Sequence, residues 1–355
     1  MNSGEELVAW LYRSTLQVDD KWAVQTEHGF TWWAHRHAQT VDVLGEENSP
    51  EGYAAWTVSV RTEVLNALTV DDQAATTLNH GLMANPSLAG FVYDDEAHTL
   101  LLCSVVAVHV GNLNWIRSLV GMAAALQLYE SAQVASKLAT DLGAENAVSG
   151  HPSSGVRWIP DNIQLFVVPS VVAPSGAEPC QWPSEEFSEV IRQCMGQPPA
   201  LLATDGGQGL TVEFPYGVQS SLCEMKGDDP HPIYGNGLSV VQSFPVDHLS
   251  EAEGARLALS LNKVDLGRQA SGYGFGSYSF TGSLIQFRTF LPNVLYRSGL
   301  LPSLYSAAAQ RARAMSVLLA GKDWTSDSFN IRHSGAGRLV FGPPPTGLGE
   351  ETQHE

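Results

Sequence analysis

The residue types of a hydrolytic site occur close together in one segment of the chain. His151, a serine at position 153 or 154 and Asp161 would supply the base, the nucleophile and the acid of a catalytic triad. Spacing along a chain does not specify a triad, however, and the sequence has no Gly-x-Ser-x-Gly elbow to present the serine. We therefore expect a protein that is not an enzyme and has no catalytic residues.

A metal site is the second kind of chemistry that the residue types allow. His35 and His37 lie two positions apart, a spacing that places both imidazoles on one face of a strand and that metal ions can use. Arg36 stands between them and no third ligand is near, so a solvated polar face is the better interpretation. The acidic pair at 228–229 lies between Gly and Pro and is typical of a turn. The sequence therefore predicts no metal ion.

Phosphate and thiol chemistry are also poorly supported. The glycine-rich segments 206–209 and 272–276 do not have the P-loop pattern and do not lie between a strand and a helix start. None of the cysteines forms a Cys-x-x-Cys pair, and Cys103 lies inside an apolar strand, so we expect unreactive thiols. No cofactor is predicted.

Five aromatic residues in the first part of the chain are candidates for a peptide-binding surface. Trp32 and Trp33 are adjacent on a predicted strand, so one ring points to each face of the sheet. One ring belongs to the core. The other could line an apolar groove with Phe30, Tyr53 or Trp56, since Trp and Tyr combine a large contact area with a polar group. Burial of the rings on both faces is, however, the better interpretation of the pattern.

The charge distribution argues against nucleic acid and anionic membranes as partners. The 355 residues carry a formal net charge of −18, from 19 basic and 37 acidic side chains, whereas phosphate binding needs clustered Lys and Arg. The charge is uneven: residues 1–145 hold 6 basic and 18 acidic side chains, and residues 184–322 hold 10 and 12. The two parts therefore present different surfaces. We expect a cytoplasmic protein, because no apolar run could span a bilayer and the acidic first residues do not resemble a signal peptide.

An internal repeat divides the chain. Five short matches recur in the same order with an offset of about 180 residues, among them Leu78-Asn79 with Leu261-Asn262 and Leu128-Tyr129 with Leu304-Tyr305. Each part has the same predicted order: a short helix, three strands, a helix with a clear N-cap, a hairpin and a long amphipathic helix. The caps lie at residues 69–72 in the first part and at residues 250–253, a capping-box pattern, in the second. This order predicts an α+β protein of two tandem α-β-β-β-α-β-β-α domains, in which helices pack on antiparallel sheets.

The predicted strands of the two parts match one another. They cover residues 22–25, 30–43 (bent or broken) and 53–65 in the first part, and residues 201–203, 210–225 and 238–244 in the second. The predicted boundaries are 1–145 for the first domain (the N-terminal half), 146–183 for a partly packed connector, 184–322 for the second domain (the C-terminal half) and 323–355 for a tail whose last part is disordered. Within the connector, the apolar residues 163–172 are predicted to pack as an extra strand.

This element order resembles the type III secretion chaperone fold, the class that includes the CesT and YbjN-type domains and the duplicated TY-Chap peptide-binding chaperone domains. The acidic composition and the segment from His151 to Arg157 after the first domain are further points of similarity. The resemblance covers about residues 1–145 and 184–322. It implies a chaperone or adaptor that binds an extended or partly unfolded client polypeptide. Such chaperones usually act as dimers, which this chain could form by itself as an intrachain pseudo-dimer.

Three functional hypotheses follow, and each predicts a different structural feature. A chaperone or adaptor should expose an apolar groove or patch, or an open sheet edge that a client strand extends. A non-catalytic scaffold subunit of a larger bacterial secretion or defence assembly should bind one folded partner instead. An enzyme should have a deep pocket that holds titratable groups with perturbed pKa values. The first hypothesis is the one that the sequence favours.

Overall fold

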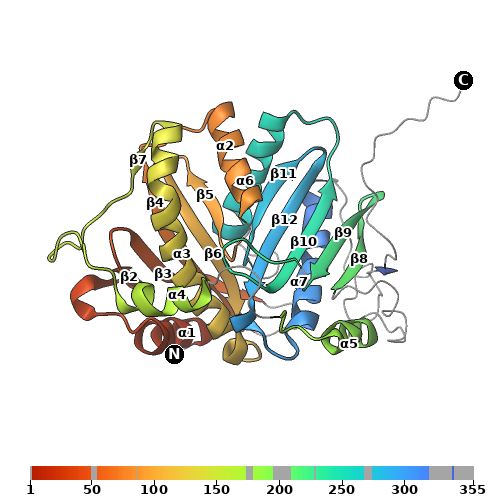
Figure 1. Ribbon diagram of the computed structural model, residues 1–355, viewed down its shortest axis with the longest axis horizontal. Coiled ribbons are helices and arrows are strands. Elements are labelled where there is room, and N and C mark those ends of the chain that lie inside the picture. Colours follow the sequence, from red (N-terminus) through yellow and green to blue (C-terminus); the bar gives the residue numbers. More distant parts are fainter. Residues whose placement is uncertain are drawn as a thin grey trace, which may run out of the picture.

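The computed structural model describes residues 2–48, 54–85, 87–172, 179–194, 209–227, 229–267, 274–319 and 338–339. It has an α+β fold in which two antiparallel sheets lie side by side and helices cover their faces (Figure 1). No helix in these ranges is both long enough and apolar enough to cross a membrane.

The N-terminal half forms the first sheet, in the order β1-β2-β3-β4-β6-β5 with β7 paired to β4. Its helices and strands are α1 (Ser3–Trp10), the π-helical turn η1 (Leu11–Thr15), η2 (Asp20–Trp22), β1 (Ala23–Gln25), β2 (Gly29–Trp33), β3 (Ala38–Asn48), β4 (Ala54–Asn66), α2 (Asp72–Ala84), β5 (Gly90–Asp94), β6 (Thr99–Val108), α3 (Leu113–Leu142) and β7 (Glu145–Asn146).

The C-terminal half forms the second sheet, in the order β11-β12-β10-β9-β8-β13. Its elements are α5 (Ser184–Cys194), β8 (Gly209–Tyr216), β9 (Gln219–Lys226), β10 (Gly237–Pro245), α6 (Glu251–Gly267), β11 (Ser277–Thr281), β12 (Leu284–Pro292), η5 (Asn293–Leu295) and α7 (Leu300–Leu318), and the two-residue strand β13 (Arg338–Leu339) pairs with β8.

The two halves share one topology. The strand order β2-β3-β4-β6-β5 of the first sheet corresponds to β8-β9-β10-β12-β11 of the second, and each sheet is followed by a long helix, α3 or α7. The α+β fold expected from the sequence is confirmed, and the common strand order is consistent with a tandem duplication.

The strand prediction was wrong in detail at two places. Residues 30–43, predicted as one bent or broken strand, form the hairpin β2–β3, because the chain reverses through bends at residues 34–37. Residues 210–225 likewise form the hairpin β8–β9, which turns at Gly217 with a φ of 58°. Pro215 is accommodated inside β8, opposite Ser220. The predicted strand at 201–203 and the predicted tail at 323–355, apart from residues 338–339, lie outside the described residues.

The middle helices begin where the sequence predicts a cap. The Asp71 carboxylate accepts the N–H of Ala74 at the start of α2. At α6, the Ser250 side chain accepts the N–H of Glu253 at 3.3 Å, while the Glu253 carboxylate accepts the Ser250 N–H at 2.9 Å. These reciprocal bonds are a capping box, which satisfies backbone donors that the first helical turn leaves free.

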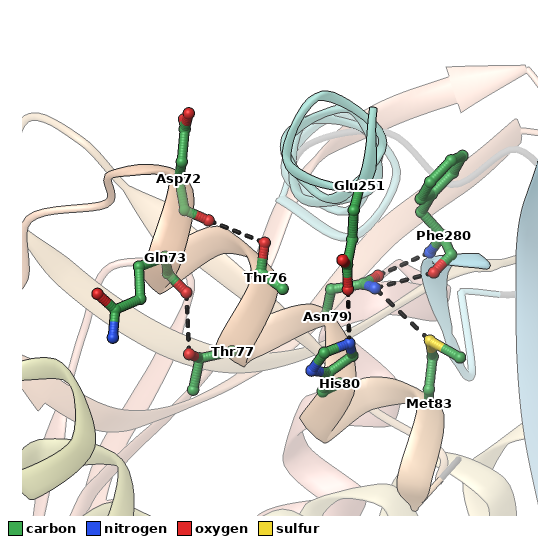
Figure 2. A network of polar contacts seen from close by, with 9 residues as sticks. All are labelled: Asp72, Gln73, Thr76, Thr77, Asn79, His80, Met83, Glu251 and Phe280. Atoms are coloured by element: carbon green, nitrogen blue, oxygen red, sulfur yellow. Dashed lines mark hydrogen bonds and ion pairs between the residues drawn. The ribbon is translucent and has the colours of Figure 1, made fainter. Parts of the chain in front are cut away.

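Helices α2 and α6 pack against each other where the two halves meet (Figure 1). The edge strand β11 lies beside them, and every second residue of an edge strand points its N–H and C=O away from its neighbour strand. Asn79 of α2 binds both groups of Phe280, at 2.6 Å and 2.9 Å (Figure 2). Asn262 of α6 does the same for Tyr278, at 2.7 Å and 3.0 Å. One asparagine from each half therefore covers the edge of β11.

Candidate functional site

Phe30 and Trp32, two of the predicted peptide-binding residues, lie in the hydrophobic core. Phe30 is 1% exposed and packs edge-on against Tyr12 with ring centroids 4.9 Å apart. Trp32 is fully buried, and its indole N–H donates to the Gln39 side-chain oxygen at 3.0 Å. Neither ring can contact a partner in this arrangement.

Trp33 points to the opposite face of the sheet, as the sequence predicts, but it is also buried. Its ring lies perpendicular to the His151 ring at 5.3 Å, and its indole N–H donates to the Ser149 hydroxyl at 3.0 Å. Both partners belong to the connector, which returns over this face. Trp56 is half-buried, and Tyr53 lies outside the described residues. Phe30, Trp32 and Trp33 therefore do not line an open groove, because the first two lie in the core and the connector covers the third.

The connector is helical where a strand was predicted. Residues Ile163–Val167 form the π-helical turn η3 and Val168–Val171 form α4. Ile163, Val168 and Val171 turn inward and are at most 4% exposed. The extra-strand prediction was therefore wrong, although the segment is packed against the N-terminal half as expected, beside α3 in Figure 1.

Polar contacts fix the start of this helical segment. The Arg157 guanidinium pairs with the Asp161 carboxylate at 2.9 Å, and the two side chains are only 13% and 10% exposed. Arg157 also donates to the Trp33 carbonyl at 3.0 Å. Asp161 accepts the Ile163 N–H at 3.1 Å through its carboxylate, and its own N–H donates to the Ala34 carbonyl at 2.7 Å. These bonds hold the connector in one place on the hairpin β2–β3.

The outer side of the same segment is apolar and exposed. Five large side chains within ten residues form what we call the connector patch: Trp158 (68% exposed), Ile159 (76%), Leu165 (47%), Phe166 (69%) and Val167 (40%). Single exposed apolar residues are common on protein surfaces, whereas large contiguous apolar patches mark interaction sites, so five such residues in one short segment are a candidate for one. The connector patch is the clearest such concentration among the described residues.

The hypothetical triad does not form. His151 Nδ1 accepts the backbone N–H groups of Ser153 and Ser154 at 3.2 Å and 3.1 Å. The Ser154 hydroxyl donates to the Lys21 carbonyl, and Asp161 is paired with Arg157. These side chains close a loop and are not arranged as nucleophile, base and acid.

The prediction for His35 and His37 was also wrong in its geometry. Both lie in the bend between β2 and β3 and not on a strand. His37 is 5% exposed, and its ring nitrogens contact the Ser131 hydroxyl at 3.1 Å and the Asn146 side-chain oxygen at 2.8 Å. Burial lowers the pKa of His37. Within the described ranges, no group of three or more His, Cys, Asp or Glu side chains is placed to hold a metal ion.

Sequence reasoning missed a second copy of one motif. His151 to Gly155 and His231 to Gly235 both read His-Pro-x-x-Gly, and both form a closed turn with a His–Gly β-bridge. In the second turn His231 Nδ1 again accepts two backbone N–H groups, at 3.1 Å and 3.2 Å. This turn carries Tyr234 into the other half, where its hydroxyl donates to Glu130 of α3. The repeated spacing was visible in the sequence, whereas the contact with Glu130 was not.

Comparisons with protein-family models, with curated proteins and with solved structures found no match for this chain.

Proposed function

We propose that the protein is a cytoplasmic, non-enzymatic chaperone or adaptor that holds a client polypeptide on the connector patch. The observation that carries this proposal is the contrast between the two sides of the connector. The inward side is fixed by the Arg157–Asp161 ion pair and by three buried aliphatic side chains, while the outward side presents five exposed apolar ones. A preformed surface of this kind binds with little loss of conformational entropy.

An apolar segment of a polypeptide fits this surface better than a membrane does. The net charge of −18 opposes approach to an anionic bilayer, whereas Trp and Phe side chains are frequent anchors in protein interfaces. Burial of one large apolar side chain contributes about 1.5–3 kcal/mol, so two or three of them can hold an unfolded segment reversibly.

Extension of a sheet edge by a client strand is less well supported. The outward groups of β11 at Tyr278 and Phe280 are taken by Asn262 and Asn79. In β8, Val212 and Glu213 are paired with β13, and β1 has only three residues. The apolar surface is therefore preferred to β-augmentation as the mode of client binding.

The test compares two double variants of the full chain. In the first, Trp158→Ser and Phe166→Ser remove the largest rings of the connector patch. In the second, Val218→Ser and Val294→Ser remove side chains that are 87% and 59% exposed elsewhere. The readout is light scattering from a chemically denatured model protein diluted into buffer with each variant.

We expect the wild type and the second variant to suppress scattering and the first variant to lose at least tenfold in potency. Equal potency of all three would rule out the connector patch as the client site. If none suppresses scattering, the chaperone proposal fails, and the scaffold hypothesis, with one folded partner on this surface, replaces it. Light scattering of the purified chain alone, at increasing concentration, separates client binding from self-association through the patch.

A further inference from the structure

A cavity of about 460 Å³ lies between the two halves. Helices α2 and α3 and the second His-Pro-x-x-Gly turn line it. Its walls are mainly apolar, with Leu82, Phe91, Leu102, Val134, Leu138 and Ile233 among the lining residues. The volume is within the range of small-molecule sites, which are mostly apolar with a few placed polar groups.

Glu130 is the charged group that stands out in this cavity. The Tyr234 hydroxyl donates to its Oε1, and the Ser87 hydroxyl donates to its Oε2 at 3.0 Å. Among the described residues, no Lys or Arg forms an ion pair with it. Burial raises the pKa of Glu130 to about 7, although the bonds from Tyr234 and Ser87 act in the opposite direction. Glu130 is half-buried, and a carboxylate that is partly withdrawn from water with no cation beside it is costly.

The other charged groups of the cavity already have partners. Lys137 pairs with Asp141 on the same helix, and His80 of α2 contacts Glu251 at 2.9 Å. In its ionised form, Glu130 therefore gives the cavity an excess negative charge. An ionised carboxylate has about four acceptor positions, and the two hydroxyls use two of them. The remaining positions and the missing countercharge both suit a ligand that is a hydrogen-bond donor and a cation.

We propose that this cavity binds an aliphatic ammonium group, with the nitrogen on the Glu130 carboxylate and the alkyl stem along the apolar walls. Tyr234 and Ser87 orient the carboxylate for the ligand. The ammonium can come from a free amine or from a lysine side chain of a polypeptide. This inference is independent of the connector patch, which is a separate surface.

The test is calorimetry on the full chain at pH 8 with n-pentylamine, and with n-pentanol as the uncharged ligand of similar shape. We expect pentylamine to bind at least tenfold more tightly than pentanol. Glu130→Gln keeps the side-chain shape and should lose at least tenfold in pentylamine affinity. Asp141→Asn, which changes the other carboxylate of the cavity, should keep most of that affinity. Equal binding of the two ligands, or loss in Asp141→Asn but not in Glu130→Gln, would overturn the proposal.

The source of the amine is decided with N-acetyl-lysine methylamide and its norleucine analogue. Binding of the lysine compound in preference to the norleucine compound assigns the site to a polypeptide side chain. Binding of pentylamine alone assigns it to a free amine. If neither amine binds to the folded wild type, the proposal is wrong.

The pH dependence of the wild type provides a check that needs no variant. Pentylamine remains protonated below pH 9, so its affinity should rise about tenfold from pH 6 to pH 8 as Glu130 ionises. The other titratable groups that face Glu130 are His80, His231, Tyr129, Tyr234, Lys137 and Asp141. His80→Gln should retain the tenfold rise, because His80 lies toward solvent with a side chain that is 61% exposed. A flat profile for the wild type contradicts the role of Glu130.

Discussion

Replacement of Asn79 by Ala should weaken the contact between the two halves. The Asn79 amide gives one donor and one acceptor to the Phe280 backbone, and the residue is 1% exposed (Figure 2). Without it, the N–H and C=O of Phe280 remain buried and unpaired. Each such group costs about 1–3 kcal/mol. We therefore expect Asn79→Ala to reduce the free energy of unfolding by about 2–6 kcal/mol, a large part of the 5–15 kcal/mol that is typical of a folded protein.

The assay is urea denaturation followed by Trp fluorescence and circular dichroism. Asn262→Ala is the matched variant, because Asn262 makes the same two bonds to Tyr278 within the C-terminal half. It should cost a similar amount but leave the contact between the halves in place. Asn79→Ala should instead separate the transition into two steps, since it weakens a bond across the interface while leaving each half intact.

His80→Ala serves as the control on the same helix. His80 contacts Glu251 across the interface, but the two side chains are 61% and 63% exposed, and exposed pairs contribute about 0–1 kcal/mol. If Asn79→Ala destabilises the protein no more than His80→Ala, the asparagine does not couple the halves. The covered edge of β11 would then have no energetic role.

Three further predictions concern other buried groups. Arg157→Met leaves the Asp161 carboxylate buried without its partner, which costs about 3–5 kcal/mol. Chymotrypsin should therefore cut the connector at least tenfold faster, while the far-ultraviolet circular dichroism spectrum stays unchanged. Cys103 and Cys223 are fully buried, and burial raises the pKa of each thiol to about 12, so mass spectrometry should find them labelled by iodoacetamide only after unfolding. The pKa of Glu130 is raised from 4.5 to about 7 on folding, so the folded state favours the protonated carboxyl group. Protonated Glu130 therefore contributes to stability below pH 4.5, and this contribution is lost as the pH rises to 7. The loss is about 2–3 kcal/mol and should be seen as a difference between the urea midpoints of the wild type and Glu130→Gln; equal pH profiles would contradict it.

The parts of the fold that were predictable depend on local signals. The caps at Asp71 and Ser250 mark the starts of α2 and α6 because capping uses side chains within three residues of the helix start. The repeat led to the correct order of helices and sheets, although the N-terminal half has a fourth strand before α2. The two matched asparagines prove to be the residues that cover β11. A sequence pattern identified these asparagines, although their role was visible only in the structure.

The failures come from contacts between distant residues. Trp32 and Trp33 point to opposite faces, as alternation predicts, but the exposure of Trp33 depends on Ser149 and His151, more than 100 residues away. The pair Glu130–Tyr234 is likewise separated by 104 residues.

The apolar stretch of the connector was misassigned for a local reason, because a short apolar run has no periodicity that distinguishes a strand from a helical turn.

The single connector explains why two halves with one topology need not have equal roles. A dimer of identical chains would carry two copies of every surface. Here the segment with Trp158 and Phe166 occurs once and packs on the N-terminal half, whose net charge is −12, while that of the C-terminal half is −2. The proposed function therefore assigns one client site to each chain, on the more acidic half. The C-terminal half contributes through the shared interface, where it supports α2 and brings Tyr234 to Glu130.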